Sequence, residues 1–179
     1  MKHAVQTVFA LSLALASPVF AASAAPPAPA AAADAAHVKA VQNLLGAMQV
    51  EKVLRGVAAR SRYASEAQRQ AVFAKLQATP PAEVYRRMAA PLASAISADT
   101  ALEMTRFYQT PYGKQVIHNK YNSGTQILMP GMKAAVPPEE AKERKRAAYV
   151  NASKALAEAQ PAIEREAFKL LQTINKERS

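Results

Sequence analysis

The sequence predicts an all-α protein that folds as a single small helical bundle of seven or eight short helices. Apolar side chains recur three and four residues apart through most of residues 37–179, which is the spacing of one buried helix face. The chain is 50% hydrophobic but only 6% aromatic, and much of its apolar content is alanine, the best helix former. We find no convincing alternation of apolar and polar residues, the pattern of a half-buried strand. The 179 residues suffice for one domain of ordinary size.

The first 21 residues have the organisation of a cleaved signal peptide. Lys2 gives a short basic start, and residues 8–16 form an apolar core of signal-peptide length. Small residues offer a cleavage site after Ala21, with an alternative site after Ala24. A membrane anchor is the other interpretation, but the apolar run is shorter than the ~20 residues that span a bilayer. We therefore expect an exported bacterial protein, either periplasmic or fully secreted.

Residues 22–36 consist almost entirely of alanine and proline. They carry little bulk for packing, and proline favours extended backbone, so the composition predicts a disordered linker. The linker could also act as an N-terminal tether. We expect the all-helical domain to follow at residues 37–179.

Residues 38–95 predict three or four amphipathic helices. The first helix either bends near residue 50 or gives way there to a second one. Ser65 begins the next helix, Pro80 and Pro81 restart the chain, and Pro91 is expected to kink or split the helix that follows. The residues expected to face inward are Val38, Val41, Leu44, Leu45, Met48, Val50, Val53, Leu54, Val57, Val72, Phe73, Leu76, Val84, Tyr85, Met88 and Leu92.

Residues 97–128 predict two helices joined by a stiff turn, around which the other helices pack. Ser97 or Thr100 caps the first helix, and Pro111 starts the second. Gly113 either gives the backbone freedom or lets another segment approach closely. The first helix has a wide apolar arc, which predicts contacts on two sides: Ala101, Leu102, Met104, Phe107 and Tyr108. The second is expected to bury Val116, Ile117, Tyr121, Gly124, Ile127 and Leu128 and to stop at residues 129–131.

The turn between these helices carries a recognisable motif. It comprises Phe107, Tyr108, Thr110, Pro111, Gly113 and Lys114, and the helix before it begins at a serine. On these residues the chain resembles the bacterial domain-of-unknown-function family 2059, which consists of small secreted or periplasmic helical proteins with a similar turn. The resemblance covers about residues 85–135. It implies a helical fold and export, and it transfers no catalytic residue because the family has no known activity.

Residues 138–177 predict a C-terminal helical hairpin, either docked on the core or loosely attached. Pro137 and Pro138 open a long charged helix, and Pro161 is expected to break it before the last helix. The inner stripe of the charged helix is formed by small residues: Ala141, Ala148, Ala152, Ala155, Leu156 and Ala159. The last helix has an apolar face: Ile163, Ala167, Leu170, Leu171 and Ile174.

The residue inventory argues against most catalytic centres. The absence of cysteine excludes disulfides, thiol catalysis and thiolate metal ligands. Of three histidines, His3 lies in the signal, His37 borders the linker and His118 lies on a polar helix face. We therefore predict no metal, no cofactor and no catalytic residue. The best carboxylate pair is Asp99 with Glu103, although Glu103 is also placed to form an ion pair with Arg106.

Two groups of residues are candidates for binding. The turn motif, together with Tyr112, predicts either core aromatics with a solvated lysine or a recognition patch that exposes Tyr112 and Lys114. The formal net charge is +10, and residues 39–120 hold 12 basic against 5 acidic side chains. A solvated face is the simplest explanation of this charge, and anion binding is the alternative. The candidate anion-binding residues are Arg55, Arg60, Arg62, Arg69, Arg86 and Arg87.

These features favour a non-enzymatic interaction module of the cell envelope. Its expected partner is an envelope protein, an anionic lipid or a cell-wall polymer, and export argues against nucleic acid. One alternative is an envelope hydrolase that uses carboxylates such as Glu103. Another is a module that self-associates through the alanine stripe.

Overall fold

The computed structural model describes residues 35–122 and 136–177, and within these ranges it contains eight helices and no strand. The prediction of an all-α bundle is therefore confirmed. The helices are α1 (Ala35–Ala47), α2 (Val50–Arg60), α3 (Glu66–Ala78), α4 (Pro81–Leu92), α5 (Ala98–Gln109), α6 (Pro111–Asn122), α7 (Pro138–Glu143) and α8 (Ala147–Lys176). None of them combines the length and the hydropathy needed to cross a bilayer.

Several predictions lie outside the described residues. These are the signal peptide with its cleavage sites at Ala21 and Ala24, the linker up to residue 34, and the end of the second central helix at residues 124–131. At the linker boundary, α1 begins at Ala35. The predicted linker end at residue 36 is therefore two residues too late, because alanine continues a helix as readily as it forms a linker.

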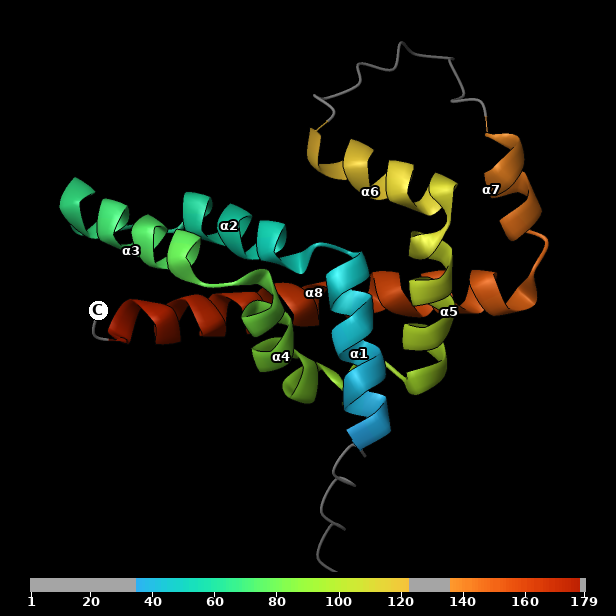
Figure 1. The fold of residues 1–179 in the computed structure, drawn as a ribbon, viewed down its shortest axis with the longest axis horizontal. Helices are drawn as coiled ribbons and strands as arrows, with labels where there is room; N and C mark the ends of the chain where they lie inside the picture. Colours follow the sequence, from blue (N-terminus) through green and yellow to red (C-terminus); the bar gives the residue numbers. More distant parts are fainter. Residues whose placement is uncertain (1–34, 123–135, 178–179) are drawn as a thin grey trace, which may run out of the picture. The chain divides into compact units, whose positions relative to one another are not determined.

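The long helix α8 joins the part of the bundle formed by α2, α3 and α4 to the part that contains α5 (Figure 1). It packs against α5 and also against α2, α3 and α4. The first helix, α1, packs extensively on both α4 and α5. The largest fully buried side chains come from α1, α2, α3, α4 and α8 and from the segments beside them: Val41, Leu44, Leu45, Met48, Val50, Leu54, Val72, Met88, Leu92, Ile96, Ile163 and Ile174.

The first apolar segment forms two helices rather than one bent helix. Gln49 separates α1 from α2 and adopts the left-handed conformation, with φ 53° and ψ 51°. This conformation is strained for a residue with a side chain, and it redirects the chain sharply. Met48 on one side and Val50 on the other are both buried, so the core holds the bend in place.

The predicted C-terminal hairpin is wrong. Pro161 lies inside α8, which continues for 30 residues, and the break falls earlier, between α7 and α8. Pro161 is solvent-exposed, and α8 buries apolar residues on both sides of it, including Leu156, Ala159 and Ile163. Burial of this continuous face offsets the hydrogen bond that proline cannot donate.

Two smaller expectations also fail. Leu102, predicted to belong to the buried arc of α5, leaves 60% of its surface exposed, whereas Ala101, Met104 and Phe107 are buried. The helix thus presents a narrower face to its neighbours than its sequence suggested. Pro91 does not divide α4, because it lies in the last turn, one residue before the helix ends.

Candidate functional site

The turn between α5 and α6 is built around the hydroxyl group of Thr110. This hydroxyl donates a hydrogen bond to the carbonyl oxygen of Phe107 at 2.7 Å and accepts one from the backbone amide of Gly113 at 3.0 Å. Thr110 therefore closes α5 and caps the first turn of α6 at once. Pro111 follows as the first residue of α6, where its missing amide hydrogen has no cost.

Gly113 is required by a close approach of the two helices. A β-carbon added there would lie 2.0 Å from the carbonyl oxygen of Phe107 and 2.7 Å from the Cα atom of Tyr108. Both contacts involve backbone atoms, which cannot move aside as a flexible side chain could. Of the two roles expected for Gly113, close approach is the one observed.

The aromatic residues of the motif lie mainly in the interior. Phe107 is buried, and the centroid of its ring lies 5.2 Å from that of Tyr108, 6.1 Å from that of Tyr112 and 4.8 Å from that of Tyr149 on α8. The Tyr112 hydroxyl donates to a carboxylate oxygen of Glu140 on α7 at 2.9 Å. Burial and this bond raise the pKa of Tyr112 to about 12. Lys114 and Pro111 are the exposed members of the motif.

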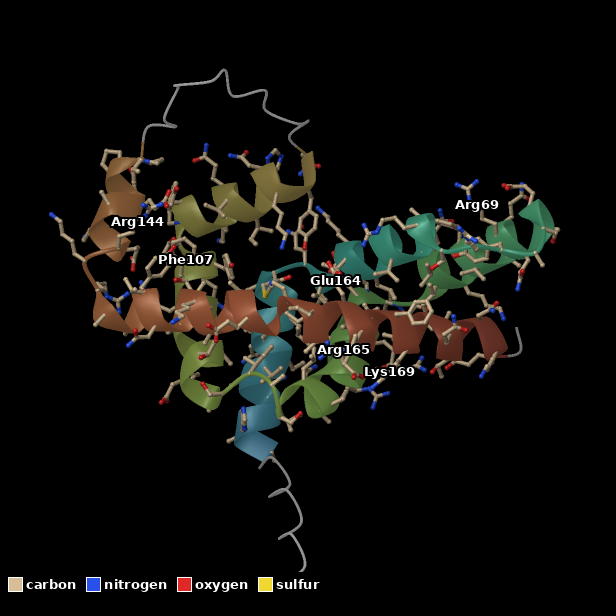
Figure 2. The ribbon with its side chains drawn as sticks, turned by 180° about the vertical axis from the view of Figure 1, so that it is seen from behind. Arg69, Phe107, Arg144, Glu164, Arg165 and Lys169 are labelled. Atoms are coloured by element: carbon tan, nitrogen blue, oxygen red, sulfur yellow. The ribbon has the colours of Figure 1, made fainter. Side chains whose placement is uncertain are left out.

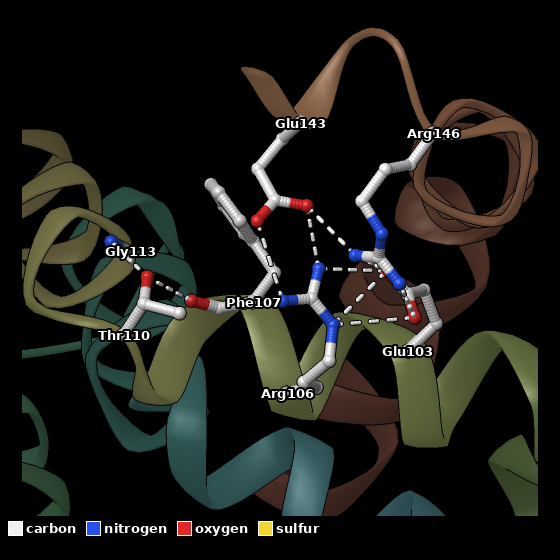
Figure 3. Close-up of polar contacts among 7 residues, drawn as sticks. All are labelled: Glu103, Arg106, Phe107, Thr110, Gly113, Glu143 and Arg146. Atoms are coloured by element: carbon white, nitrogen blue, oxygen red, sulfur yellow. Dashed lines mark hydrogen bonds and ion pairs between the residues drawn. The ribbon is translucent and has the colours of Figure 1, made fainter. Parts of the chain in front are cut away.

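Four charged side chains from α5, α7 and the start of α8 form a closed network, which we call the charged junction: Glu103, Arg106, Glu143 and Arg146 (Figure 3). Arg106 bonds to Glu103 at 2.8 Å and to Glu143 at 2.6 Å. Arg146 bonds to the same two carboxylates at 2.7 Å and 2.8 Å. Each guanidinium therefore bridges both acids, an arrangement that gives charge-assisted bonds fixed geometry.

The charged junction holds α7 in place. This six-residue helix buries none of its own side chains, so apolar packing contributes little to its position. The side chains of Glu103 and Glu143 are only 14% and 15% exposed, whereas both arginines are 40% exposed. Hydrogen bonds from Arg106 hold the pKa of each carboxyl below its ordinary value, with Arg146 adding to the effect. Both acids are thus stabilised as carboxylates.

The charged junction contains Glu103, one of the two carboxylates in the predicted pair Asp99 and Glu103. The expected Glu103–Arg106 ion pair is confirmed, at 2.8 Å. A general acid requires a raised pKa, and that of Glu103 is lowered. Its intended partner, Asp99, is exposed in the first turn of α5. The sequence could not reveal Glu143 and Arg146 as further partners, because they lie about 40 residues away on other elements.

A cavity of about 690 Å³ lies beside the turn, with Phe107, Tyr112 and Val116 among its lining residues. Its charged lining residues are Glu139, Lys142 and Glu143, of which Glu143 is already bound to two arginines. Because the two arginines neutralise Glu143, the remaining charges of Glu139 and Lys142 cancel, so this cavity favours no ligand charge.

The six predicted anion-binding arginines do not form one surface. Three of them are paired with acids: Arg69 with Glu66, Arg86 with Glu83, and Arg87 with Glu177. The other three, Arg55, Arg60 and Arg62, are exposed on α2 or just after it and have no ion pair among the described residues. The candidate set therefore divides into paired and available cations.

Of these three arginines, only Arg60 lines a groove of about 730 Å³ between α2 and α8, which we call the basic groove. It is lined by Val57, Arg60, Ser61, Pro161, Glu164, Arg165, Phe168 and Lys169. Arg165 and Lys169 lie one turn apart on α8. They are far from Arg144, which lies in the turn between α7 and α8 (Figure 2). Sequence reasoning found Arg60 but missed Arg165, Phe168 and Lys169, which lie over 100 residues later and join it only through the packing of α2 on α8.

The described histidines and acids do not assemble a metal site. Within residues 35–122 and 136–177, no group of three or more histidine, aspartate and glutamate side chains could hold a metal ion. His37 lies 2.7 Å from the carbonyl oxygen of Ile96, and His118 is exposed on α6.

Comparison of the chain with protein-family models, with curated proteins and with solved structures found no match.

Proposed function

We propose that the protein is an exported, non-enzymatic module that binds an anionic partner in the cell envelope through the basic groove. The observation that carries this proposal is the convergence of Arg60, Arg165 and Lys169 around one exposed groove, with Glu164 as the single acid among its lining residues. Cations from two helices that face the same concave surface concentrate positive potential there, which attracts anions.

The pairing pattern supports this choice of surface. Arg60 and Arg165 have no ion pair among the described residues, whereas Lys169 shares its charge with Glu166 at 2.7 Å. At the charged junction, by contrast, every arginine already contacts two carboxylates. An incoming anion would have to displace internal acids at the junction. At the groove it meets two exposed arginines, Arg60 and Arg165, that have no ion pair among the described residues.

Export is part of the proposal and rests on the first 21 residues. The basic start, the short apolar core and the small residues before Ala21 and Ala24 support a cleaved signal. Cell fractionation followed by N-terminal sequencing tests this directly. A mature chain that starts at Ala22 or Ala25 is the expected result, and a chain that retains Met1 in the cytoplasm would contradict it.

The two alternative functions, an envelope hydrolase and a self-association module, have less support. Glu103 contacts two arginines, which favours an ionised structural carboxylate over a general acid. The alanine stripe proposed for self-association contributes Ala152 and Ala159 to the protein's own core. Ala148 is exposed, but a lone alanine offers little surface for a second copy.

The proposal is tested with a soluble polyanion, polyglutamate, and the purified mature protein. We expect binding that weakens steeply as salt is raised, and that is lost in the double variant Arg60→Glu/Arg165→Glu. The control is Lys145→Glu/Lys154→Glu, which changes the net charge equally at two exposed lysines that do not line the groove. Equal loss in both variants would show that binding follows net charge alone and would contradict a groove site.

A further inference from the structure

We infer that the basic groove docks the protein onto an anionic membrane surface, with the ring of Phe168 entering the lipid interface. This inference rests on the proposed function and specifies its partner. It starts from Phe168, which is 48% exposed, whereas the other described phenylalanines and tyrosines are buried or half-buried. Exposure of a phenyl ring to water is unfavourable, and here the exposed ring lines the same groove as the cations.

The surroundings of Phe168 match the requirements of a lipid interface. Arg165 precedes it by three residues and Lys169 follows it directly, while Arg60 lines the same groove from α2. An apolar ring surrounded by long basic side chains can enter the acyl boundary while the cations remain at the headgroups. Each arginine or lysine near an anionic leaflet strengthens the attraction, and a single weakly inserted ring needs that contribution.

A protein partner fits this surface less well. Stable protein interfaces bury a continuous apolar centre, and the two exposed apolar side chains of the groove, Pro161 and Phe168, supply only a small one. The neighbours of Phe168 one turn away on α8, Glu164 and Gln172, are exposed and polar. A soluble polyanion would use the cations but would gain nothing from the phenyl ring. The combination of both features favours a lipid surface.

The negative charge of Glu164 opposes the proposed binding of anionic headgroups. This residue is the acid among the lining residues of the groove, and it has no ion pair among the described residues. Because its charge opposes anionic headgroups, Glu164→Gln should tighten vesicle binding by about threefold to fivefold. The control Glu158→Gln removes an exposed acid of α8 that does not line the groove and should change binding less.

The test uses the mature protein and vesicles of phosphatidylcholine with and without phosphatidylglycerol. The chain contains no tryptophan, so Phe168→Trp creates a single tryptophan, whose emission can be excited separately from that of the tyrosines. We expect its emission to shift to the blue only with phosphatidylglycerol. The same reporter at the exposed Leu102, on α5, should not shift. Reporter spectra that are unchanged by the anionic vesicles would overturn the inference.

Co-sedimentation with the same vesicles measures how much each side chain contributes to binding, in variants that lack the tryptophan reporter. Phe168→Ser should weaken binding to phosphatidylglycerol vesicles by about tenfold, whereas Leu102→Ser should leave it unchanged. Arg60→Glu/Arg165→Glu should weaken it by about thirtyfold or more. Circular dichroism establishes that each variant is folded. Equal binding of Phe168→Ser and the parent protein would overturn insertion of the ring.

The two proposals fail in different ways. Groove-dependent binding of polyglutamate without binding of anionic vesicles would overturn the membrane inference and leave the proposed function standing. Absence of salt-sensitive binding to both probes would overturn the two together. Vesicle binding that depends on Phe168 and on the groove cations supports both.

Discussion

The charged junction and the basic groove use the same residue type in opposite ways. At the junction, Arg106 and Arg146 each contact Glu103 and Glu143, and the charges cancel within the protein. At the groove, Arg60 and Arg165 face solvent with no ion pair among the described residues. Figure 2 shows these two regions apart along α8, with Arg144 and Phe107 near its N-terminal end and Arg165 and Lys169 past its middle.

The difference shows why counting arginines does not locate a binding surface. A cation that is already hydrogen-bonded to two carboxylates stabilises the fold and attracts external anions weakly. A cation without an internal partner contributes little to stability and keeps its field directed to solvent. We therefore expect substitutions at the junction to change stability and substitutions at the groove to change binding.

The largest expected effect on stability comes from the turn beside the junction. Gly113→Ala should lower the free energy of unfolding by about 3 kcal/mol, because the new methyl group meets the backbone of Phe107 and Tyr108. Near the groove, Gly56→Ala on α2 meets only the mobile end of Arg60, at 3.4 Å, and should stabilise by about 1 kcal/mol. Urea unfolding measures both. An unchanged or raised free energy of unfolding in Gly113→Ala would show that the turn is not tightly packed.

Pro161→Ala tests the helix that joins the two regions. Alanine restores a backbone donor and a favourable helix residue at an exposed position, so stability should rise by about 2 kcal/mol. Chemical denaturation gives the value, and the exposed Ala157→Ser on the same helix serves as a control of small effect. A loss of stability would indicate that α8 needs the proline for its path past α2.

Glu143→Gln tests the junction through its pH dependence. Because the pKa of Glu143 lies below its ordinary value of 4.5 in the folded protein, its stabilising effect is present above that value. The effect is lost as the pH falls through the lowered folded pKa. The variant should therefore lose about 1 kcal/mol at pH 7, and the loss should shrink as the pH falls through the lowered pKa of Glu143, below which both proteins carry an uncharged side chain.

The control for this prediction lies at the groove. Glu164→Gln removes an acid that has no ion pair among the described residues, so its unfolding free energy at pH 7 should match that of the parent protein. A double-mutant cycle of Glu143→Gln with Arg106→Gln isolates the coupling across the junction. Full additivity in that cycle would show that the contact does not stabilise the protein.

The smallest effect is expected at the groove arginines. Arg60→Ala and Arg165→Ala should each change the free energy of unfolding by no more than about 0.5 kcal/mol, because both side chains are exposed and unpaired among the described residues. Thermal melts at matched salt concentration provide the comparison with Arg106→Ala, which should be the less stable protein. Equal melting temperatures for all three would remove the distinction between the two regions.

Much of the local structure could be predicted because its causes are local. Ser97 caps α5, Ser65 caps α3, and α6 begins at Pro111, as expected from hydrogen-bonding capacity and from proline geometry. The Glu103–Arg106 pair was also predictable, since residues three apart on a helix face one another. The break at Gln49 was predicted only as one of two alternatives, a bent helix or two helices, because neither glycine nor proline occupies position 49 itself.

The candidate site could be predicted only in fragments. Arg60 stands out as part of a basic stretch, but nothing near it in the sequence indicates Arg165 or Phe168. Their juxtaposition depends on the packing of α2 against α8. The division between paired and unpaired arginines has the same origin, because Arg87 meets Glu177 across 90 residues.

By itself, the sequence determined the fold class, the caps of several helices and the turn at Thr110, Pro111 and Gly113. Each of these follows from propensities and hydrogen bonds within a few residues. Tertiary structure alone decided that α8 continues through Pro161, that Leu102 remains exposed, and that the charged junction neutralises two arginines while the groove leaves others available. The physical reason is that burial and charge pairing depend on which surfaces meet in space, and those surfaces come from segments far apart in the chain.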